Sequence, residues 1–300
     1  MRERQQRREQ RERLALRQQW EHPARDDAPR LPDSTQDLLS TLGSLVDEAA
    51  EQMKVERTRV ELAVALQRHM LPPELPRLDR LRLAVRYAPS QRGLDVGGDW
   101  YDAFTMGDGT VGLAIGDVQG HDVEAAAFMG QIRVGLRALA GATSDPGEIL
   151  RHANDLLVSM GGGLFATCCF LRFDPATGCL DLARAGHIPM VWACEDGNWG
   201  IAQDRGGPPL GVLAGERYPV THRVVTVAGS LVLLTDGVVE GPACPVGSGL
   251  DRVAAMVRGG FLDEPDVLAG RVIAAAERTG HEDDAAVLVA RYDGPARRAA

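Results

Sequence analysis

Four aspartates occupy the same kind of position, the point where an apolar strand meets a tight turn: Asp99, Asp117, Asp236 and Asp283. Any one of them alone would most simply be a turn former or a helix cap. Strand ends of a layered β fold can converge on one edge, where four carboxylates without cations would repel one another. Carboxylates suit Mg²⁺ or Mn²⁺ better than Zn²⁺. The four positions therefore predict a site for divalent metal ions.

A pair of such ions suits the hydrolysis of a phosphate ester. Two adjacent ions can lower the pKa of a water, orient it, and stabilise charge on a phosphoryl group. The sequence contains no GxSxG elbow, no GxxxxGK[ST] loop and no HExxH motif, each of which would indicate a different chemistry. We therefore expect the four aspartates to be catalytic through metal-activated water, without a Ser or Cys nucleophile.

The composition is that of an ordinary soluble globular protein, with 44% hydrophobic and 25% charged residues in a chain of 300. The net charge of −9 argues against general nucleic-acid binding. No apolar run approaches the ~20 residues of a membrane span, and the Arg-rich start lacks the apolar core of a signal peptide. The five cysteines form no CxxC pair and are typical of buried free thiols. We expect a cytoplasmic protein.

Composition and periodicity divide the chain into four parts. Residues 1–33 are rich in Arg and Gln and form either a solvated helix or a disordered segment, followed by a linker. Residues 34–72 predict a helix whose apolar residues follow a heptad seam: Leu39, Leu42, Val46, Ala49, Met53, Val60 and Ala63. That seam either packs on the helix's own domain or forms a homodimer through residues 34–70. Residues 73–293 predict the catalytic domain, and residues 294–300 a disordered tail.

The order of the predicted elements indicates the fold class. A strand and a hairpin are followed by a helix pair, a β-meander, a second helix pair and a last strand. The predicted helices cover residues 123–141, 146–160, about 250–258 and 264–278, and the last strand covers residues 285–292. This order is typical of antiparallel sheets covered by helices, an α+β layered architecture.

Several short motifs resemble those of one family. They are VGGDWYD (96–102), GDVQGHD (116–122), AGHIPM (185–190), GPPLGV (207–212), TDGVVE (235–240) and EDDAAVLV (282–289). In this order they resemble the metal-dependent protein phosphatases of the 2C superfamily (PPM), in the bacterial SpoIIE/RsbU-like branch. LQRHMLP (66–72) resembles the segment that leads into that catalytic domain. The resemblance covers about residues 62–292.

The resemblance implies an α-β-β-α sandwich of two antiparallel sheets with a site for two Mn²⁺ or Mg²⁺ ions. By motif, Asp99 would bridge the two ions, and Asp117 would be a ligand beside the backbone carbonyl of Val118. Asp236 and Asp283 would complete the shell of one ion. Asp284 is the alternative to Asp283.

The resemblance also implies a protein-serine/threonine phosphatase. Its substrate would be phosphoserine or phosphothreonine on a small anti-anti-sigma protein of the STAS type. A catalytically weak, phosphoprotein-binding regulator on the same fold is the alternative function.

Four further positions are candidates for the site: Asp122, His121, His187 and Gly98. Asp122 stands where the family commonly has Gly, and its carboxylate either links to a metal through water or caps the following helix, which the helix dipole favours. His121 and His187 could be general acids or could bond to backbone groups in a structural role. Gly98 directly precedes Asp99 and completes the set of candidate site residues.

Overall fold

The computed structural model describes residues 35–89, 97–120, 123–161, 163–242, 244–279 and 283–295. The chain divides into two units, Met1–Lys54 and Val55–Ala300. The predictions for residues 1–33, for His121 and Asp122, and for residues 296–300 lie outside the described residues.

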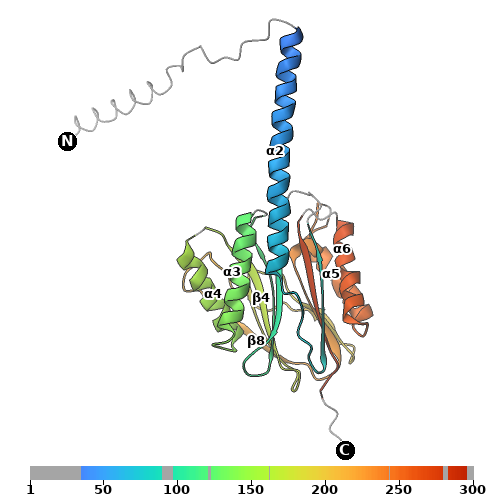
Figure 1. Cartoon of the computed structure of the whole chain (residues 1–300). Helices are drawn as coiled ribbons and strands as arrows, with labels where there is room; N and C mark the ends of the chain where they lie inside the picture. The colour runs from blue at the N-terminus through green and yellow to red at the C-terminus, as the bar shows by residue number, and fades with distance from the viewer. Residues whose placement is uncertain are drawn as a thin grey trace, which may run out of the picture. The chain divides into compact units, whose positions relative to one another are not determined.

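One long helix, α2 (Thr35–Met70), occupies most of the segment 34–72 that was predicted to be helical (Figure 1). Its described apolar side chains in the first unit are exposed, and they include Leu39, Leu42, Leu45, Val46 and Met53. In the described part of the chain, none of the helices combines the length and apolar character that crossing a membrane requires. The predicted homodimer is not tested by these observations and stays a prediction.

In the described part of the chain, ten strands form two antiparallel sheets of five strands each. Sheet A has the strand order β1 (Leu81–Ala88), β10 (Ala285–Tyr292), β9 (Gly229–Leu234), β6 (Val191–Cys194) and β7 (Trp199–Ile201). Sheet B has the order β2 (Trp100–Thr105), β3 (Val111–Val118), β4 (Ala166–Phe173), β5 (Cys179–Ala185) and β8 (Val220–Val224). The α+β prediction is confirmed.

Two helices cover the outer face of each sheet (Figure 1). Helices α3 (Val123–Leu139) and α4 (Pro146–Met160) pack on sheet B, and α5 (Val246–Gly260) and α6 (Pro265–Thr279) pack on sheet A. Three apolar clusters fill the spaces between these four layers, one of them between the two sheets. This is the α-β-β-α sandwich that the resemblance implied.

Strand β7 was not predicted, because it is only three residues long and carries an exposed tryptophan, so it shows no alternation of buried and exposed positions. Strand β8 is short, since only Val220–Val224 pairs with β5.

Strands β2 and β3 approach each other closely just before Asp117. Trp100 of β2 is fully buried and lies opposite Gly116 of β3. A Cβ atom at Gly116 would lie 2.2 Å from a ring carbon of Trp100 and 2.3 Å from the backbone oxygen of Thr167. Only glycine fits there, so the tryptophan ring can pack directly beside the backbone that leads into Asp117.

Candidate functional site

The four predicted aspartates lie at strand ends in both sheets. Asp99 directly precedes β2, and Asp117 is the last residue but one of β3, the neighbouring strand of sheet B. Asp236 follows β9 and begins a 3₁₀ turn, η1 (Asp236–Val238), while Asp283 lies two residues before β10, the neighbour of β9 in sheet A. Because both strand pairs are antiparallel, each pair brings its two aspartates to the same end of its strands. We call these strand ends the acidic edge of each sheet.

A threonine joins these two edges. The Thr235 hydroxyl donates a hydrogen bond of 2.7 Å to Oδ2 of Asp99, which begins sheet B. The same hydroxyl accepts a hydrogen bond of 2.8 Å from the backbone N–H of Ala286 in β10. Thr235 and Asp99 are both buried, with 0% and 2% exposure. Thr235 therefore fixes the carboxylate of one sheet against the backbone of the other.

A buried histidine makes a second connection between the sheets. Nε2 of His187 lies 3.0 Å from the backbone oxygen of Leu234 in sheet A, and Nδ1 lies 2.8 Å from the Thr167 hydroxyl in sheet B. Since a carbonyl oxygen only accepts, Nε2 carries the proton and Nδ1 accepts from the threonine. Burial lowers the pKa of His187 to about 4, so the ring is neutral near pH 7. These contacts give His187 a structural role.

The carboxylates lie close enough to raise one another's pKa values. Burial raises the pKa of Asp99 well above its usual range, and the charges of Asp117 and Asp284 raise it further. Burial raises the pKa of Asp117 to about 8, and the carboxylates of Asp236 and Asp283 add to that rise. The pKa of Asp236 is raised by burial and then by Asp283. No arginine or lysine among the described residues is a main influence on the pKa values of Asp99, Asp117 and Asp236, so no basic side chain balances the negative charge of these carboxylates when they are ionised.

The two adjacent aspartates before β10 differ in their surroundings. Asp284 is 2% exposed, and its carboxylate accepts a hydrogen bond from the Tyr87 hydroxyl of β1. Asp283 is exposed, and its Oδ1 accepts a hydrogen bond of 2.8 Å from the N–H of Asp284. Asp283 therefore faces outward beside Asp236, whereas Asp284 lies deeper, near Asp99. Sequence reasoning missed Tyr87 because its partner is 197 residues away.

Gly98 leaves room for oxygen atoms in the middle of the cluster. A Cβ atom on Gly98 would lie 2.4 Å from the backbone oxygen of Val118, 3.0 Å from Oδ1 of Asp117 and 3.2 Å from the backbone oxygen of Gly120. The N–H of Val118 donates to the backbone oxygen of Gly98 at 3.2 Å. The absence of a side chain at Gly98 thus lets a carboxylate and two carbonyl oxygens converge.

These donors fit a hard divalent cation. The described groups are carboxylate and carbonyl oxygens, the ligands that Mg²⁺ and Mn²⁺ prefer. Among the described residues, no three His, Cys, Asp or Glu side chains are close enough around one point to hold an ion by themselves. Backbone carbonyls such as that of Val118, and water, would share the coordination, as is usual for Mg²⁺.

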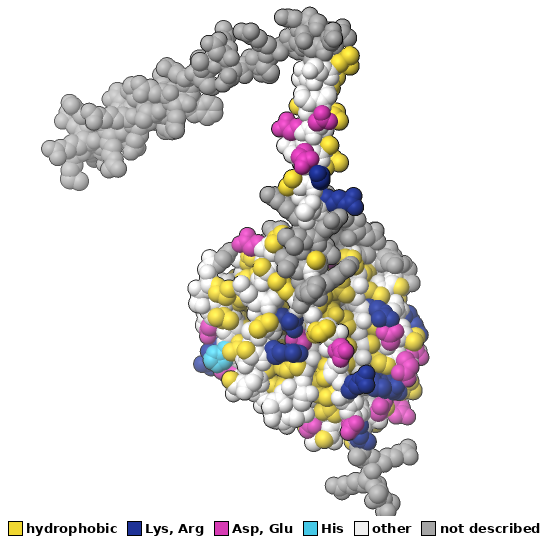
Figure 2. Space-filling model, viewed as in Figure 1, with side chains coloured by type: hydrophobic (Ala, Val, Ile, Leu, Met, Phe, Trp, Pro, Cys, Tyr) yellow, Lys and Arg dark blue, Asp and Glu magenta, His cyan; other side chains and the backbone are white. Residues whose placement is uncertain are grey.

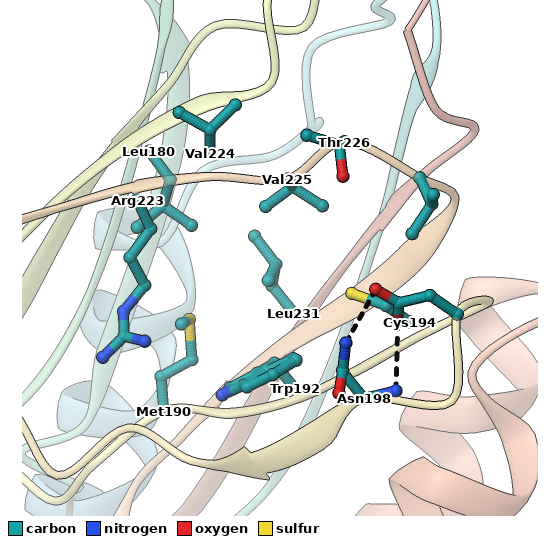
Figure 3. A pocket seen from close by; sticks show the side chains of 12 residues that line it. Leu180, Met190, Trp192, Cys194, Asn198, Arg223, Val224, Val225, Thr226 and Leu231 are labelled. Carbon is teal, nitrogen blue, oxygen red and sulfur yellow. Dashed lines mark hydrogen bonds between the residues drawn. The ribbon is translucent and has the colours of Figure 1, made fainter.

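Two cavities differ in chemistry. One of about 340 Å³ adjoins the carboxylates and is lined by Asp236, Gly237, Glu240, Gly241, Pro242 and Asp283. A second, of about 350 Å³, is mostly apolar and lies between the sheets (Figure 3). Its lining includes Leu180, Val224 and Leu231, toward the strand ends remote from the aspartates. Only the first cavity belongs to the acidic site.

Replacing Thr235 with valine tests the connection between the sheets. Thr235→Val keeps the shape of the side chain but leaves Asp99 Oδ2 and the Ala286 N–H without their hydroxyl partner. We expect the free energy of unfolding to fall by about 1–3 kcal/mol, the range for leaving a buried polar group unpaired. Urea denaturation followed by circular dichroism measures the change. Thr235→Ser, which keeps the hydroxyl, should restore most of the loss, and equal stability of the two variants would contradict the assignment.

The raised pKa of Asp117 predicts how metal-free protein responds to pH. Between pH 6.5 and 8 the folded state holds a proton on Asp117 that the unfolded state, with its ordinary carboxyl pKa, has released. The titration of Asp117 should therefore lower the free energy of unfolding as pH rises through this window, by at most about 1.4 kcal/mol per pH unit, and Asp99, whose pKa is also raised, adds to this decrease. His187 opposes this decrease at the lower end of the window, because its ring is neutral in the folded state but about half protonated in the unfolded state at pH 6.5.

Thermal unfolding in EDTA at pH 6.5, 7.25 and 8 measures this trend. Asp117→Asn should make the slope shallower, since an amide does not titrate, and added Mn²⁺ should reverse it by stabilising the ionised carboxylates. An unchanged slope in Asp117→Asn would show that another group causes the decrease.

Comparison with known proteins places these features in a family. Residues 107–293 match the family described as Stage II sporulation protein E (SpoIIE). Among curated proteins, the chain is 28% identical over 222 residues to Protein IcfG of Synechocystis sp. and 22% identical over 212 residues to Phosphoserine phosphatase RsbU of Bacillus subtilis. These matches cover 64% and 70% of this chain, but only 34% and 58% of those proteins.

Solved structures show the same fold. The RsbU and RsbW domains of Rv1364c from Mycobacterium tuberculosis match with a TM-score of 0.66 and 28% identity, over 76% of this chain and 64% of that one. The catalytic domain of the serine/threonine protein phosphatase PstP, solved with two manganese ions, matches with a TM-score of 0.56 and 17% identity, over 71% of this chain and 98% of that one. Since the family match covers more than half of its length, the chain belongs to the SpoIIE family.

Proposed function

We propose that this chain is a metal-dependent protein phosphatase that hydrolyses phosphoserine or phosphothreonine on a regulatory protein. The observation that carries the proposal is the convergence of aspartates from both sheets, whose pKa values rise through burial and mutual repulsion. A cluster of this kind is suited to divalent cations and, through them, to a phosphoryl group. The names of relatives support this reading, since RsbU is named a phosphoserine phosphatase.

In this proposal the carboxylates of Asp99, Asp117, Asp236 and Asp283 and the carbonyl of Val118 hold two Mn²⁺ or Mg²⁺ ions. Such ions, when bound, lower the pKa of a water and neutralise charge on a phosphoryl group. PstP, a fold neighbour, was solved with two manganese ions, which supports the number of ions.

The positions of the carboxylates suggest how they share this work. Asp117 is only partly buried and responds to the charges of Asp236, Asp283 and Asp284 together, so it is central among the ligands. Asp99 lies deeper and is fixed by Thr235. The bridging role of Asp99 and the choice of Asp283 over Asp284 stay predictions. The same holds for Asp122 and His121, which lie outside the described residues.

Turnover with added metal tests the function. Purified protein should hydrolyse para-nitrophenyl phosphate and a phosphoserine peptide with Mn²⁺ and lose this activity in EDTA. Asp117→Ala and Asp236→Ala should each reduce kcat/KM by more than about 100-fold, since even loss of a group that only supports a metal ligand costs 10–100-fold.

Asp266→Ala is the matched control, because this aspartate is 61% exposed on α6 and pairs with Arg86 away from the site. We expect its activity to be unchanged. Tight binding of a phosphorylated protein without any metal-dependent hydrolysis would contradict the proposal and favour a phosphoprotein-binding regulator on the same fold.

The resemblance supports a phosphorylated anti-anti-sigma protein of the STAS type as the substrate. We also propose a homodimer through residues 34–70, because Leu42 and Val46 of α2 are 53% and 64% exposed and belong to the heptad seam. Light scattering should give the mass of a dimer for the unaltered chain and of a monomer for Leu42→Glu combined with Val46→Glu. A monomer in both cases would refute the dimer.

A further inference from the structure

Strand β1 alternates between two environments. Its charged side chains Arg82 and Arg86 lie on the outer side of sheet A, where they pair with Glu264 and Asp266. Figure 2 shows acidic and basic side chains close together on the flank that carries α6. The other set of β1 side chains packs against the apolar cluster between the two sheets: Leu81, Leu83, Val85 and Tyr87. Because successive side chains of a strand point to opposite faces, the Tyr87 ring is directed into the space between the sheets.

The hydroxyl of Tyr87 reaches the acidic edge of sheet A. Tyr87 lies opposite Ala286 in the ladder between β1 and β10, and its hydroxyl donates a hydrogen bond to Oδ2 of Asp284, two residues before Ala286. Asp284 is 2% exposed. A ring that is packed between two sheets has few alternative positions, so the hydroxyl holds the buried carboxylate in one place.

Asp284 lies in turn against the backbone that leads into Asp99. A Cβ atom on Gly97 would lie 1.0 Å from Oδ2 of Asp284, so this oxygen fills the place that a side chain at position 97 would take. The charge of Asp284 also helps to raise the pKa of Asp99, which agrees with this closeness. The Asp284 carboxylate is therefore enclosed between the Tyr87 hydroxyl and the buried backbone of Gly97, beside Asp99.

We propose that Tyr87 is a positioning residue of the metal site. Its hydroxyl fixes the Asp284 carboxylate, and that carboxylate supports the Gly97–Gly98 backbone that carries Asp99 into the site. Whether Asp283 or Asp284 is the ligand, Asp284 is the group through which Tyr87 acts. The inference rests on the metal site of the proposed phosphatase and adds a residue that sets its affinity for metal. Loss of a group that supports a metal ligand typically weakens metal affinity by 10–100-fold.

Calorimetric titration of Mn²⁺ into the metal-free chain tests this role without turnover. Tyr87→Phe keeps the ring and removes only the hydroxyl, and we expect it to raise the Kd for Mn²⁺ by about tenfold. On para-nitrophenyl phosphate, the same variant should need about tenfold more Mn²⁺ for half-maximal activity, with kcat at saturating Mn²⁺ little changed.

Tyr292→Phe is the matched control. Tyr292 is 1% exposed and lies at the other end of β10, and its hydroxyl makes no hydrogen bond within the part of the chain that the structure describes. The Kd for Mn²⁺ should be unchanged in this variant. An equal rise in Kd in Tyr292→Phe, or an unchanged Kd in Tyr87→Phe, would overturn the proposal.

Two further variants separate positioning from packing. If Tyr87 acts through Asp284, the double variant Tyr87→Phe with Asp284→Asn should bind Mn²⁺ within about twofold of Asp284→Asn alone. Effects that multiply instead would mean that Tyr87 acts elsewhere. Gly97→Ala displaces the carboxylate from its other side while Tyr87 stays intact, so it should also weaken Mn²⁺ binding by about tenfold or more.

A Gly97→Ala chain that binds Mn²⁺ normally would likewise contradict the role of Asp284, even where Tyr87→Phe does not fold. Circular dichroism in EDTA shows whether each variant is folded. If the unaltered chain binds Mn²⁺ and Tyr87→Phe weakens that binding, but no phosphate ester is hydrolysed, the proposed phosphatase function fails while the positioning role stands.

Discussion

The hydrogen bond between the Thr235 hydroxyl and the Asp99 carboxylate ties sheet A to sheet B at the edge where both present acidic side chains. Such an edge is unfavourable by itself, because burial and like charge both oppose ionisation of the carboxylates. Hydrogen bonds between the sheets, made by Thr235 and His187, fix the two sheets against each other without adding a positive charge beside the carboxylates. Burial and mutual repulsion therefore favour the protonated carboxylates, and in the proposed function divalent cations would replace those protons where the two sheets meet.

Three buried polar side chains near this edge each make two hydrogen bonds to other segments of the chain. Thr235 connects Asp99 to β10, His187 connects β4 to the end of β9, and Asn154 connects α4 to the loop after Leu210. Buried polar groups are tolerated only when they are paired. Their pairing fixes the buried carboxylate of Asp99 and the backbone of the loop after Leu210, where Val212 and Leu213 are about half exposed.

Sequence patterns predicted much of this arrangement, for identifiable reasons. The aspartates could be found because apolar alternation shows where a strand ends, and α4 and β10 have the predicted bounds because Pro146 begins the helix and a polar turn precedes the strand. Thr235 and Tyr87 could not be found, since a single hydroxyl in an apolar strand shows no period. Their partners lie 136 and 197 residues away. Only the pairing of the strands reveals such contacts.

The place of β10 in sheet A has a consequence for how the protein matures. This strand is the last of the described chain, yet it lies between β1, the first strand, and β9. During synthesis, β1 has no neighbour in its sheet until residues 285–292 have left the ribosome. The aspartates that precede β10 arrive at the same moment. A growing or truncated chain therefore lacks both the strand that joins β1 to β9 and the part of the acidic edge that precedes β10.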